Sequence, residues 1–300
     1  MSQDYKKIIQ REYLNCVKSP VHFMKKYCKI QHPTKGKIKF NLYDYQQEML
    51  TDFVDNRYNI ILKSRQLGIS TLSAGYSLWM MLFNQDKNIL VIAKDKDTAK
   101  NLVTKVRIMY ANLPQWLKTK VIEDNKLSLV FSNGSQIKAV AATAEAGRSE
   151  ALSLLVIDEA AFIDKIDTIW TAAQQTLATG GDCIALSTPN GVGNWFHQQW
   201  MGAVDGTNNF NTIKLHWTCH PERDDVWRAE QDKVLGPSQA AQECDADFLT
   251  SGESVVDPQI LTWYKENQVC EPVEKIGVDN NLWIWEQPDY TKEYIVVADV

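Results

Sequence analysis

The sequence predicts an α/β protein with a mostly parallel sheet flanked by helices. From residue 58 onward, short apolar stretches alternate with helical stretches, and turn residues separate them. The run at 154–157 is continuously apolar, as expected of a parallel strand buried on both faces. The 44% hydrophobic content of these 300 residues is enough for a large core. In such folds, ligands bind at the carboxyl ends of the strands.

The N-terminal part is predicted to be helical over residues 6–30, with a break at Pro20. Residues 36–42 alternate polar and apolar side chains, which is typical of a half-buried strand. A helix over 45–53 follows.

From residue 58 onward, the alternating pattern predicts both strands and helices. Strands are predicted at 58–62, 88–93, 154–157 and 183–186, and helices at 70–83, 97–111 and 168–178. Asn133-Gly134 predicts a hairpin that joins 127–131 to 136–141. Past Asn194 the pattern weakens, and only two short helices, 226–234 and 238–246, are expected.

The expected domain organisation has four parts. Residues 1–42 form a helical and strand segment, 43–215 the α/β core, and 216–257 a small helical lid or linker. Residues 250–258 have the composition of a linker. Because 294–300 reads as a core strand carrying Asp299, we expect 258–300 to begin a second domain that is truncated here.

Composition excludes several classes of function. The formal net charge of −5 argues against a globally basic nucleic-acid binder. The six cysteines are scattered without a C-x-x-C pair, which favours free thiols over a zinc site. No run of eighteen apolar residues and no apolar leader core is found, so a soluble, intracellular protein without a membrane role is expected.

The strongest chemical motif follows the strand at 58–62 and opens a helix, which is the position of a phosphate-binding loop. Gly68 and Ser70 occupy their slots of the G-x-x-x-x-G-K-[ST] pattern, but Ile69 stands where the lysine belongs. Lys63 takes the slot of the first glycine, from which its ammonium can reach the β- and γ-phosphates. The expected nucleotide-contacting residues are Lys63, Ser64, Arg65, Gln66, Leu67, Gly68, Ile69, Ser70 and Thr71.

A second motif makes ATP hydrolysis the preferred interpretation. The strand at 154–157 ends in Asp158-Glu159. Asp158, together with the Ser70 hydroxyl, is expected to hold Mg²⁺, and Glu159 to polarise the attacking water. An acidic pair at a strand end also serves as a helix cap, but that alternative leaves the loop at Lys63 unexplained.

Two further segments fit the same site. Tyr45 and Gln46 lie just upstream of the loop and are candidates to recognise adenine, although an ordinary polar helix start is equally compatible. Ser187-Thr188-Pro189 ends the strand at 183–186 and is a candidate sensor of the γ-phosphate, with a plain turn as its alternative.

These segments together resemble the large terminase family of tailed phages, especially its T4-like branch, whose loop also reads Ser-Arg-Gln-Leu-Gly. The resemblance implies a P-loop fold of the RecA-like (ASCE) type. It makes Arg65 a γ-phosphate contact in cis and Arg148 an arginine finger for a neighbouring subunit. Asp299 is similar to the first metal ligand of the family's RNase H-like nuclease. Ile69 departs from that branch, which keeps lysine there.

The resemblance also implies a function and partners. It implies an ATP- and Mg²⁺-dependent motor that moves double-stranded DNA into a prohead. The implied partners are the portal protein, the small terminase subunit and further copies of the chain in a ring. The implied location is the host cell cytoplasm.

For several other residues, the sequence predicts a surface or core role. Lys94, Lys96, Lys100, Lys105 and Arg107 read as a solvated basic helix face. Trp195, Phe196 and Trp200 read as core, with Trp195 and Trp200 as alternatives for framing a nucleotide lid.

Two other functions compete with the packaging motor. A helicase-type ATPase needs a second RecA-like domain, which is not visible after Asn194. A nucleotide-gated assembly protein would have lost hydrolysis along with the usual lysine.

Overall fold

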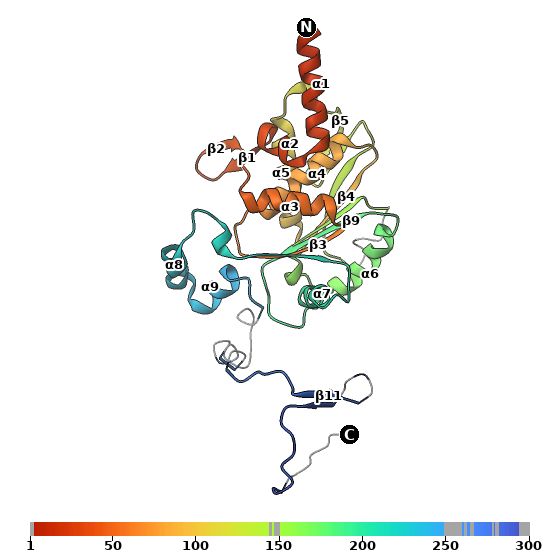
Figure 1. The fold of residues 1–300 in the computed structure, drawn as a ribbon. Coiled ribbons are helices and arrows are strands. Elements are labelled where there is room, and N and C mark those ends of the chain that lie inside the picture. Colours follow the sequence, from red (N-terminus) through yellow and green to blue (C-terminus); the bar gives the residue numbers. More distant parts are fainter. Residues whose placement is uncertain are drawn as a thin grey trace. The chain divides into compact units, whose positions relative to one another are not determined.

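The computed structural model describes residues 3–143, 146, 151–248, 260, 263–264, 267–277, 279 and 282–293. The chain divides into two compact units, Met1–Glu253 and Ser254–Val300. Figure 1 shows the first unit as a sheet enclosed by helices. Its helices are α1 (Gln3–Lys18), α2 (Pro20–Tyr27), α3 (Asp44–Asp55), α4 (Ile69–Phe83), α5 (Lys96–Ala111), α6 (Ile166–Leu177), α7 (Trp195–Val204), α8 (Asp225–Leu235) and α9 (Pro237–Cys244).

An eight-stranded sheet in the order β10-β3-β9-β8-β4-β7-β6-β5 forms the centre of this unit. All pairs from β10 to β7 are parallel, whereas β7, β6 and β5 pair antiparallel. The strands are β3 (Tyr58–Lys63), β4 (Asn88–Ala93), β5 (Val121–Asn125), β6 (Ser128–Phe131), β7 (Gln136–Ala141), β8 (Leu154–Asp158), β9 (Asp182–Ser187) and β10 (Asn211–Leu215). The predicted α/β class with a mostly parallel sheet is confirmed.

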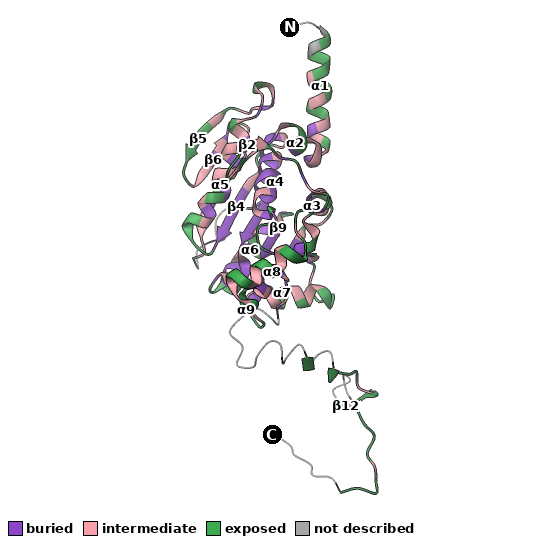
Figure 2. Cartoon of the chain, turned by 90° about the vertical axis from the view of Figure 1, so that its left-hand side faces the viewer, coloured by how far each residue is buried: buried purple, intermediate pink, exposed green. Residues whose placement is uncertain are grey.

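The sheet is covered on both faces because its central strands are apolar on both sides. Their purple colour in Figure 2 marks them as buried. Ile61 belongs to the cluster formed with α2, α3, α4 and α5. Its neighbours Ile60 and Leu62 belong to the opposite cluster, with α6 and α7. Trp195 and Phe196 lie in that second cluster and Trp200 packs against it, in agreement with the predicted core role.

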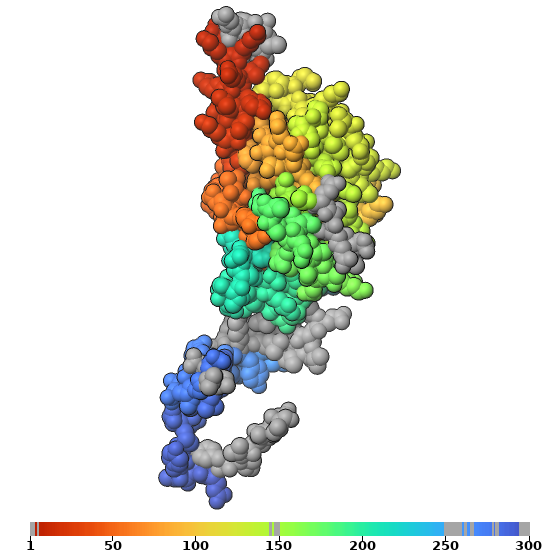
Figure 3. All heavy atoms as spheres, turned by 90° about the vertical axis from the view of Figure 1, so that its right-hand side faces the viewer, coloured from red at the N-terminus to blue at the C-terminus, as the bar shows by residue number. Residues whose placement is uncertain are grey.

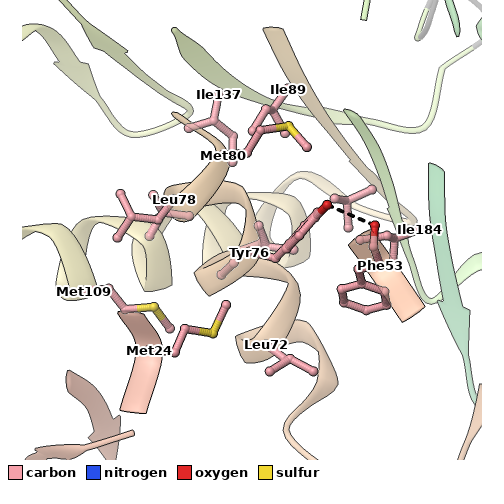
Figure 4. Packing of buried hydrophobic residues seen from close by; sticks show 14 of the residues in the cluster. Met24, Phe53, Leu72, Tyr76, Leu78, Met80, Ile89, Met109, Ile137 and Ile184 are labelled. Carbon is pink, nitrogen blue, oxygen red and sulfur yellow. Dashed lines mark hydrogen bonds between the residues drawn. The ribbon is translucent and has the colours of Figure 1, made fainter. Parts of the chain in front are cut away.

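Helix α4 lies in the interior of the first cluster (Figure 4). The Tyr76 hydroxyl donates to the Phe53 carbonyl at 3.0 Å, which joins α4 to α3. Gly75 allows close approach of α2, since a Cβ there would lie 2.8 Å from Met24 Sδ.

The helices and strands predicted from the sequence agree with the structure, with a few corrections. The first predicted helix does not reach Ile30, because β1 (Lys29–His32) pairs with β2 (Gly36–Lys39) and Ile30 faces Ile38. The hairpin at Asn133-Gly134 is confirmed: β6 pairs antiparallel with β7, and Gly134 has φ +81°. Helix α7 and the strands β5 and β10 were not predicted.

The remaining segments were only partly predicted. Figure 3 shows another face of the first unit, with red α1 at one end and the green and teal segments near residues 160–220 at the other. In the second unit, β11 (Glu274–Ile276) pairs antiparallel with β12 (Leu282–Ile284). The predicted linker at 250–258 and the predicted strand at 294–300 lie outside the described residues. Among the described residues, no helix is long and apolar enough to cross a membrane.

Candidate functional site

Residues that the sequence predicts to carry the chemistry lie together at the carboxyl edge of the sheet. β9 lies between β3 and β8, with Leu62 paired to Ser187 and Leu186 paired to Asp158. The strand order therefore brings the ends of three strands together: Lys63 from β3, Ser187 from β9 and Asp158 from β8. This is the edge at which parallel α/β sheets bind ligands.

The loop between β3 and α4 presents its backbone as a set of hydrogen-bond donors. Gly68 is the N-cap of α4 in the left-handed conformation (φ 76°), and Gln66 is also left-handed at φ 59°. The N–H groups of residues 66–70 donate to no described residue. Unpaired N–H groups at the N-terminus of a 15-residue helix favour an anion.

Lys63 and Asp158 are buried charges at this edge, with 9% and 5% of their surfaces exposed. Burial lowers the pKa of Lys63, and the nearby Asp158 and Glu159 carboxylates oppose that shift. Burial likewise raises the pKa of Asp158, opposed by Lys63 and by a hydrogen bond with the Ser70 side chain. A buried cation, a carboxylate and a hydroxyl are thus held beside the free N–H groups of the loop.

Glu159 lies beside this cluster at the solvent boundary. Its backbone is left-handed (φ 55°), and its N–H donates to Asp158 Oδ1 at 3.1 Å. Its Oε2 is 3.4 Å from Nζ of Lys94, and its side chain is 41% exposed. Sequence reasoning placed Lys94 on a solvated helix face, but the structure pairs it with the predicted water-activating residue.

Arg65 is held by α9. Its N–H donates to the Glu243 carbonyl at 2.7 Å, and its Nη1 lies 3.3 Å from Glu243 Oε1. The neighbouring Ser64 hydroxyl donates to the Cys244 carbonyl. In this structure the Arg65 guanidinium is therefore paired with a carboxylate of α9.

Arg223, which sequence reasoning missed, also fixes the loop. Its Nη2 donates to the carbonyls of Arg65 and Gln66 at 3.1 and 3.2 Å. Its guanidinium lies 4.4 Å from the ring centroid of Trp227. The spacing of Arg223 and Trp227 is the only sequence signal, and it is too common to indicate a loop contact.

Tyr45 and Gln46 contact the loop directly. The Tyr45 hydroxyl and Gln46 Nε2 both donate to the Leu67 carbonyl, at 2.9 and 3.0 Å. Gln46 Oε1 accepts from the N–H of Tyr43 at 3.2 Å. Both ends of the Gln46 amide are thus used within the chain, and adenine recognition by this pair stays a prediction.

The segment Ser187-Thr188-Pro189 connects the acidic strand end to α9. The Ser187 hydroxyl accepts from the N–H of Ala161 at 3.1 Å, in the turn that follows Glu159. The Pro189 carbonyl accepts from Gln242 Nε2 of α9 at 3.2 Å. Ser187 and Thr188 are buried, so the segment lies inside the site region.

The basic run on α5 does not form one solvated face, which corrects the sequence-based interpretation. Lys105 is half-buried beside a cavity of about 100 Å³ that Thr71 also lines. Burial lowers the pKa of Lys105, and the Asp158 carboxylate opposes the shift. Arg107 is paired with Asp124 at 2.5 Å. Of the five, Lys94 and Lys96 are exposed, and Lys100 is partly so.

Two predicted site residues, Arg148 and Asp299, lie outside the described residues. Their expected roles, an arginine finger and a nuclease metal ligand, stay predictions.

The donors that are present fit Mg²⁺ and a polyphosphate. Magnesium prefers hard oxygen ligands and takes few of them from the protein, which matches the Ser70 hydroxyl and the Asp158 carboxylate. Phosphates are matched by the free N–H groups of 66–70 and by Lys63, whose charge is otherwise costly to bury.

An eight-stranded, mostly parallel sheet with a phosphate-type loop at its edge defines a class of protein, the α/β domains that bind phosphate-bearing ligands. A sequence profile described as "Terminase large subunit, T4likevirus-type, N-terminal" matches residues 60–277. The chain belongs to this family of phage large terminases.

Solved structures show the same fold. The ATPase domain of the Thermus phage P74-26 large terminase superposes with a TM-score of 0.57 at 20% identity, covering 70% of this chain and 94% of that domain. The HK97 bacteriophage large terminase gives a TM-score of 0.63 at 16% identity and covers 78% of this chain. The large terminase of a thermophilic bacteriophage, solved in complex with ADP, gives 0.56 at 14% identity and covers 68% of it. This chain spans about half the length of the latter two, 55% and 52%.

Proposed function

We propose that this chain is the ATP-hydrolysing motor part of a large terminase, which drives double-stranded DNA into a prohead. The observation that carries the proposal is the convergence of Lys63, Ser70 and Asp158 on the unpaired N–H groups of the loop. Membership of the terminase family and the ADP complex of the thermophilic bacteriophage's large terminase support the same conclusion.

Each residue has a role in the proposed reaction. The N–H groups of 66–70 and the Lys63 ammonium bind the phosphates, and Ser70 and Asp158 hold Mg²⁺. When bound, the metal ion neutralises phosphate charge. Glu159 accepts a proton from water. The water oxygen forms a bond to the γ-phosphorus, while the bond between the γ-phosphorus and the oxygen that leaves with ADP breaks.

Arg65 and Arg148 are proposed to stabilise the charge that develops on the transferred phosphoryl group, Arg65 in cis and Arg148 from a neighbouring subunit. Arg65 must first separate from Glu243, since one guanidinium edge is engaged there. Tyr45 and Gln46 are proposed to lie at the adenine end of the nucleotide, next to Leu67.

Coupling to movement is proposed to pass through Ser187-Thr188-Pro189. Ser187 contacts the turn after Glu159, and Pro189 contacts α9, which in turn contacts Arg65. Loss of the γ-phosphate at the loop can therefore change the position of α9 through a continuous set of contacts.

The proposed partners are duplex DNA, the portal protein, the small terminase subunit and further copies of the chain in a ring. The proposed location is the host cell cytoplasm. Asp299 is proposed to be one ligand of a nuclease metal site.

Phosphate release with and without duplex DNA, combined with an unwinding assay, tests the motor proposal. We expect ATP turnover that duplex DNA stimulates, without strand separation. Strand separation would support a helicase-type ATPase, and the absence of turnover even with DNA and portal would support a nucleotide-gated assembly protein.

A further inference from the structure

The N-terminal segment is strongly basic up to the start of α3. Residues 13–43 contain seven lysines and no aspartate or glutamate, although the whole chain has a formal net charge of −5. The hairpin of β1 and β2 (residues 29–39), which we call the basic hairpin, lies beside α2 at the left of the first unit in Figure 1. It carries four of these lysines: Lys29, Lys35, Lys37 and Lys39.

The pairing of the two strands gathers three of these lysines on one face. Lys29 pairs with Lys39, and Gln31 pairs with Lys37. Because residues directly opposite each other in an antiparallel pair point to the same side, these three lysines share a face, and all are exposed. Ile30, on the other face, packs against the core. Like charges directly opposite each other repel, so binding of an anion would relieve this face.

His32 closes the turn of the basic hairpin. Its Nδ1 accepts from the N–H groups of Thr34 and Lys35, at 3.2 and 3.1 Å. Gly36 follows in the left-handed conformation at φ +68°. Lys35 therefore lies at the tip as a fourth exposed cation. A turn that is already ordered loses less conformational freedom when the hairpin binds a ligand.

The four lysines of the basic hairpin are not neutralised by the described part of the chain. No ion pair among the described residues includes any of them. The neighbouring lysines of α2 are different, because Lys26 pairs with Glu12 at 2.6 Å and Lys25 donates to Gln47 at 3.2 Å. The hairpin thus presents positive charge that is available to an external anion.

The spacing and chemistry of these lysines suit a phosphate backbone. Lys37 and Lys39 stand two residues apart on one strand, about 7 Å, and Lys29 stands about 5 Å from Lys39 across the pair. Duplex DNA presents a dense, regular row of negative charges to such a surface. Residues 29–39 contain no Phe, Tyr or Trp, so the hairpin lacks the stacking platform that single strands require. Lysines contact phosphates without reading bases.

We propose that the basic hairpin binds the phosphate backbone of double-stranded DNA, without reading its sequence. Lys29, Lys37 and Lys39 contact phosphates from one face of the hairpin, and Lys35 does so from its tip. This inference rests on the proposed function, because it names a surface through which the motor holds the DNA that it moves. The binding itself can be measured without ATP.

Fluorescence anisotropy of a short labelled duplex, measured at several salt concentrations and without ATP, tests the proposal. The hairpin variant replaces Lys29, Lys37 and Lys39 by Gln. Its affinity at about 0.1 M salt is expected to fall at least about tenfold. The slope of log affinity against log salt should become shallower by about 2–3, because three phosphate contacts are lost. Two duplexes of unrelated sequence should lose affinity equally.

A matched control removes the same charge from exposed lysines scattered over the first unit, with Lys7→Gln, Lys126→Gln and Lys233→Gln combined. This variant is expected to lose less than about threefold, since solvent screens charges that do not touch the DNA. Equal losses in the two variants would overturn the proposal. Arginine at the three hairpin positions keeps the charge and is expected to keep wild-type affinity, which separates lost contacts from a lost fold.

Polyglutamate and a single strand of the same length are the competing anions. Both are expected to bind the chain more weakly than the duplex does. Binding of polyglutamate that depends on the basic hairpin, with duplex binding unchanged in the hairpin variant, would overturn the proposal in favour of an acidic protein partner. A single strand bound as tightly as the duplex through these lysines would overturn the assignment to double-stranded DNA.

Phosphate release from ATP distinguishes this inference from the proposed function. Without DNA, turnover in the hairpin variant is expected to equal that of wild type, since the replaced lysines are not among the residues proposed to contact the nucleotide. The duplex concentration for half-maximal stimulation should rise about tenfold, in line with the lost affinity. Unchanged stimulation would overturn the inference and keep the motor. Duplex binding through the hairpin in a chain that hydrolyses no ATP would contradict the proposed function and keep the DNA site.

Discussion

Lys63 and Asp158 are charged side chains, and burying either of them is unfavourable for the stability of the fold. Each is nearly enclosed, and burial disfavours the charged form of both. No direct ion pair joins them in the described part of the chain, so each acts on the other through space. A bound Mg²⁺–polyphosphate would supply the missing counter-charges, which explains why a fold tolerates this arrangement.

Lys63→Met is expected to destabilise the chain at neutral pH by about 3 kcal/mol, because the buried Asp158 carboxylate loses its main counter-charge. The raised pKa of Asp158 means that its protonated form favours folding, and this contribution is lost as the pH rises through that pKa. The lowered pKa of Lys63 means that wild type bears the cost of a buried ammonium at acidic pH.

Both effects should make the Lys63→Met deficit smaller as the pH falls below neutral. Urea unfolding of the two proteins at neutral pH and near pH 5 measures this difference. A deficit that grows on acidification would contradict the assigned direction of the two pKa shifts.

Local signals explain which site residues could be predicted. Lys63, Ser70 and Asp158 stand at strand ends or helix starts, which the sequence marks by apolar runs and Gly68. Arg223 and Glu243 reach the loop from about 160 to 180 residues away in the chain. No sequence periodicity encodes such contacts, because packing of α9 and of the residues before α8 on the loop creates them.

Helix α9 and the residues before α8 act as a support for the phosphate loop. They hold the loop through the Arg65 and Ser64 contacts with α9 and through the two carbonyls bound by Arg223. The planar fork of an arginine suits two adjacent carbonyl acceptors, whereas a lysine is a point charge.

Arg223→Lys is therefore expected to loosen the loop and raise KM for ATP by about tenfold, equivalent to about 1.4 kcal/mol, with little change in kcat. Lys233→Ala, at an exposed position of α8, is the matched control and should behave as wild type. An unchanged KM in Arg223→Lys would show that the loop keeps its shape without this support.

Element prediction succeeded where the apolar pattern is strong and failed at the edges of the sheet. β3, β4, β8 and β9 are nearly continuous apolar runs, and all four were predicted. β10 has one fully buried residue, Leu215, and β5 has none, so neither shows the pattern of a core strand. Both become strands because a neighbouring strand offers them hydrogen bonds.

In the whole molecule, every described residue proposed to contact the nucleotide belongs to the first compact unit, Met1–Glu253. A fragment of residues 1–253 is therefore expected to fold and to bind Mg·ATP with an affinity within about threefold of the full chain, since it loses no contact to the ligand. Isothermal titration of both proteins measures this. A loss of binding in the fragment would mean that residues after 253 complete the site.

Hydrolysis is a property of the assembly if Arg148 acts between subunits. The ATPase rate per chain is then expected to rise with protein concentration in wild type and to stay low in Arg148→Ala. Equal rates per chain at all concentrations would favour Arg65 acting alone.

The most direct test of the central claim compares ATP binding with ATP turnover in wild type and Glu159→Gln. The substitution is nearly isosteric and removes the proton acceptor only. The proposed site predicts that Mg·ATP affinity changes by less than about threefold while phosphate release falls by at least about a hundredfold. Wild-type turnover in Glu159→Gln would contradict the assignment of this sheet edge as an ATP-hydrolysing site.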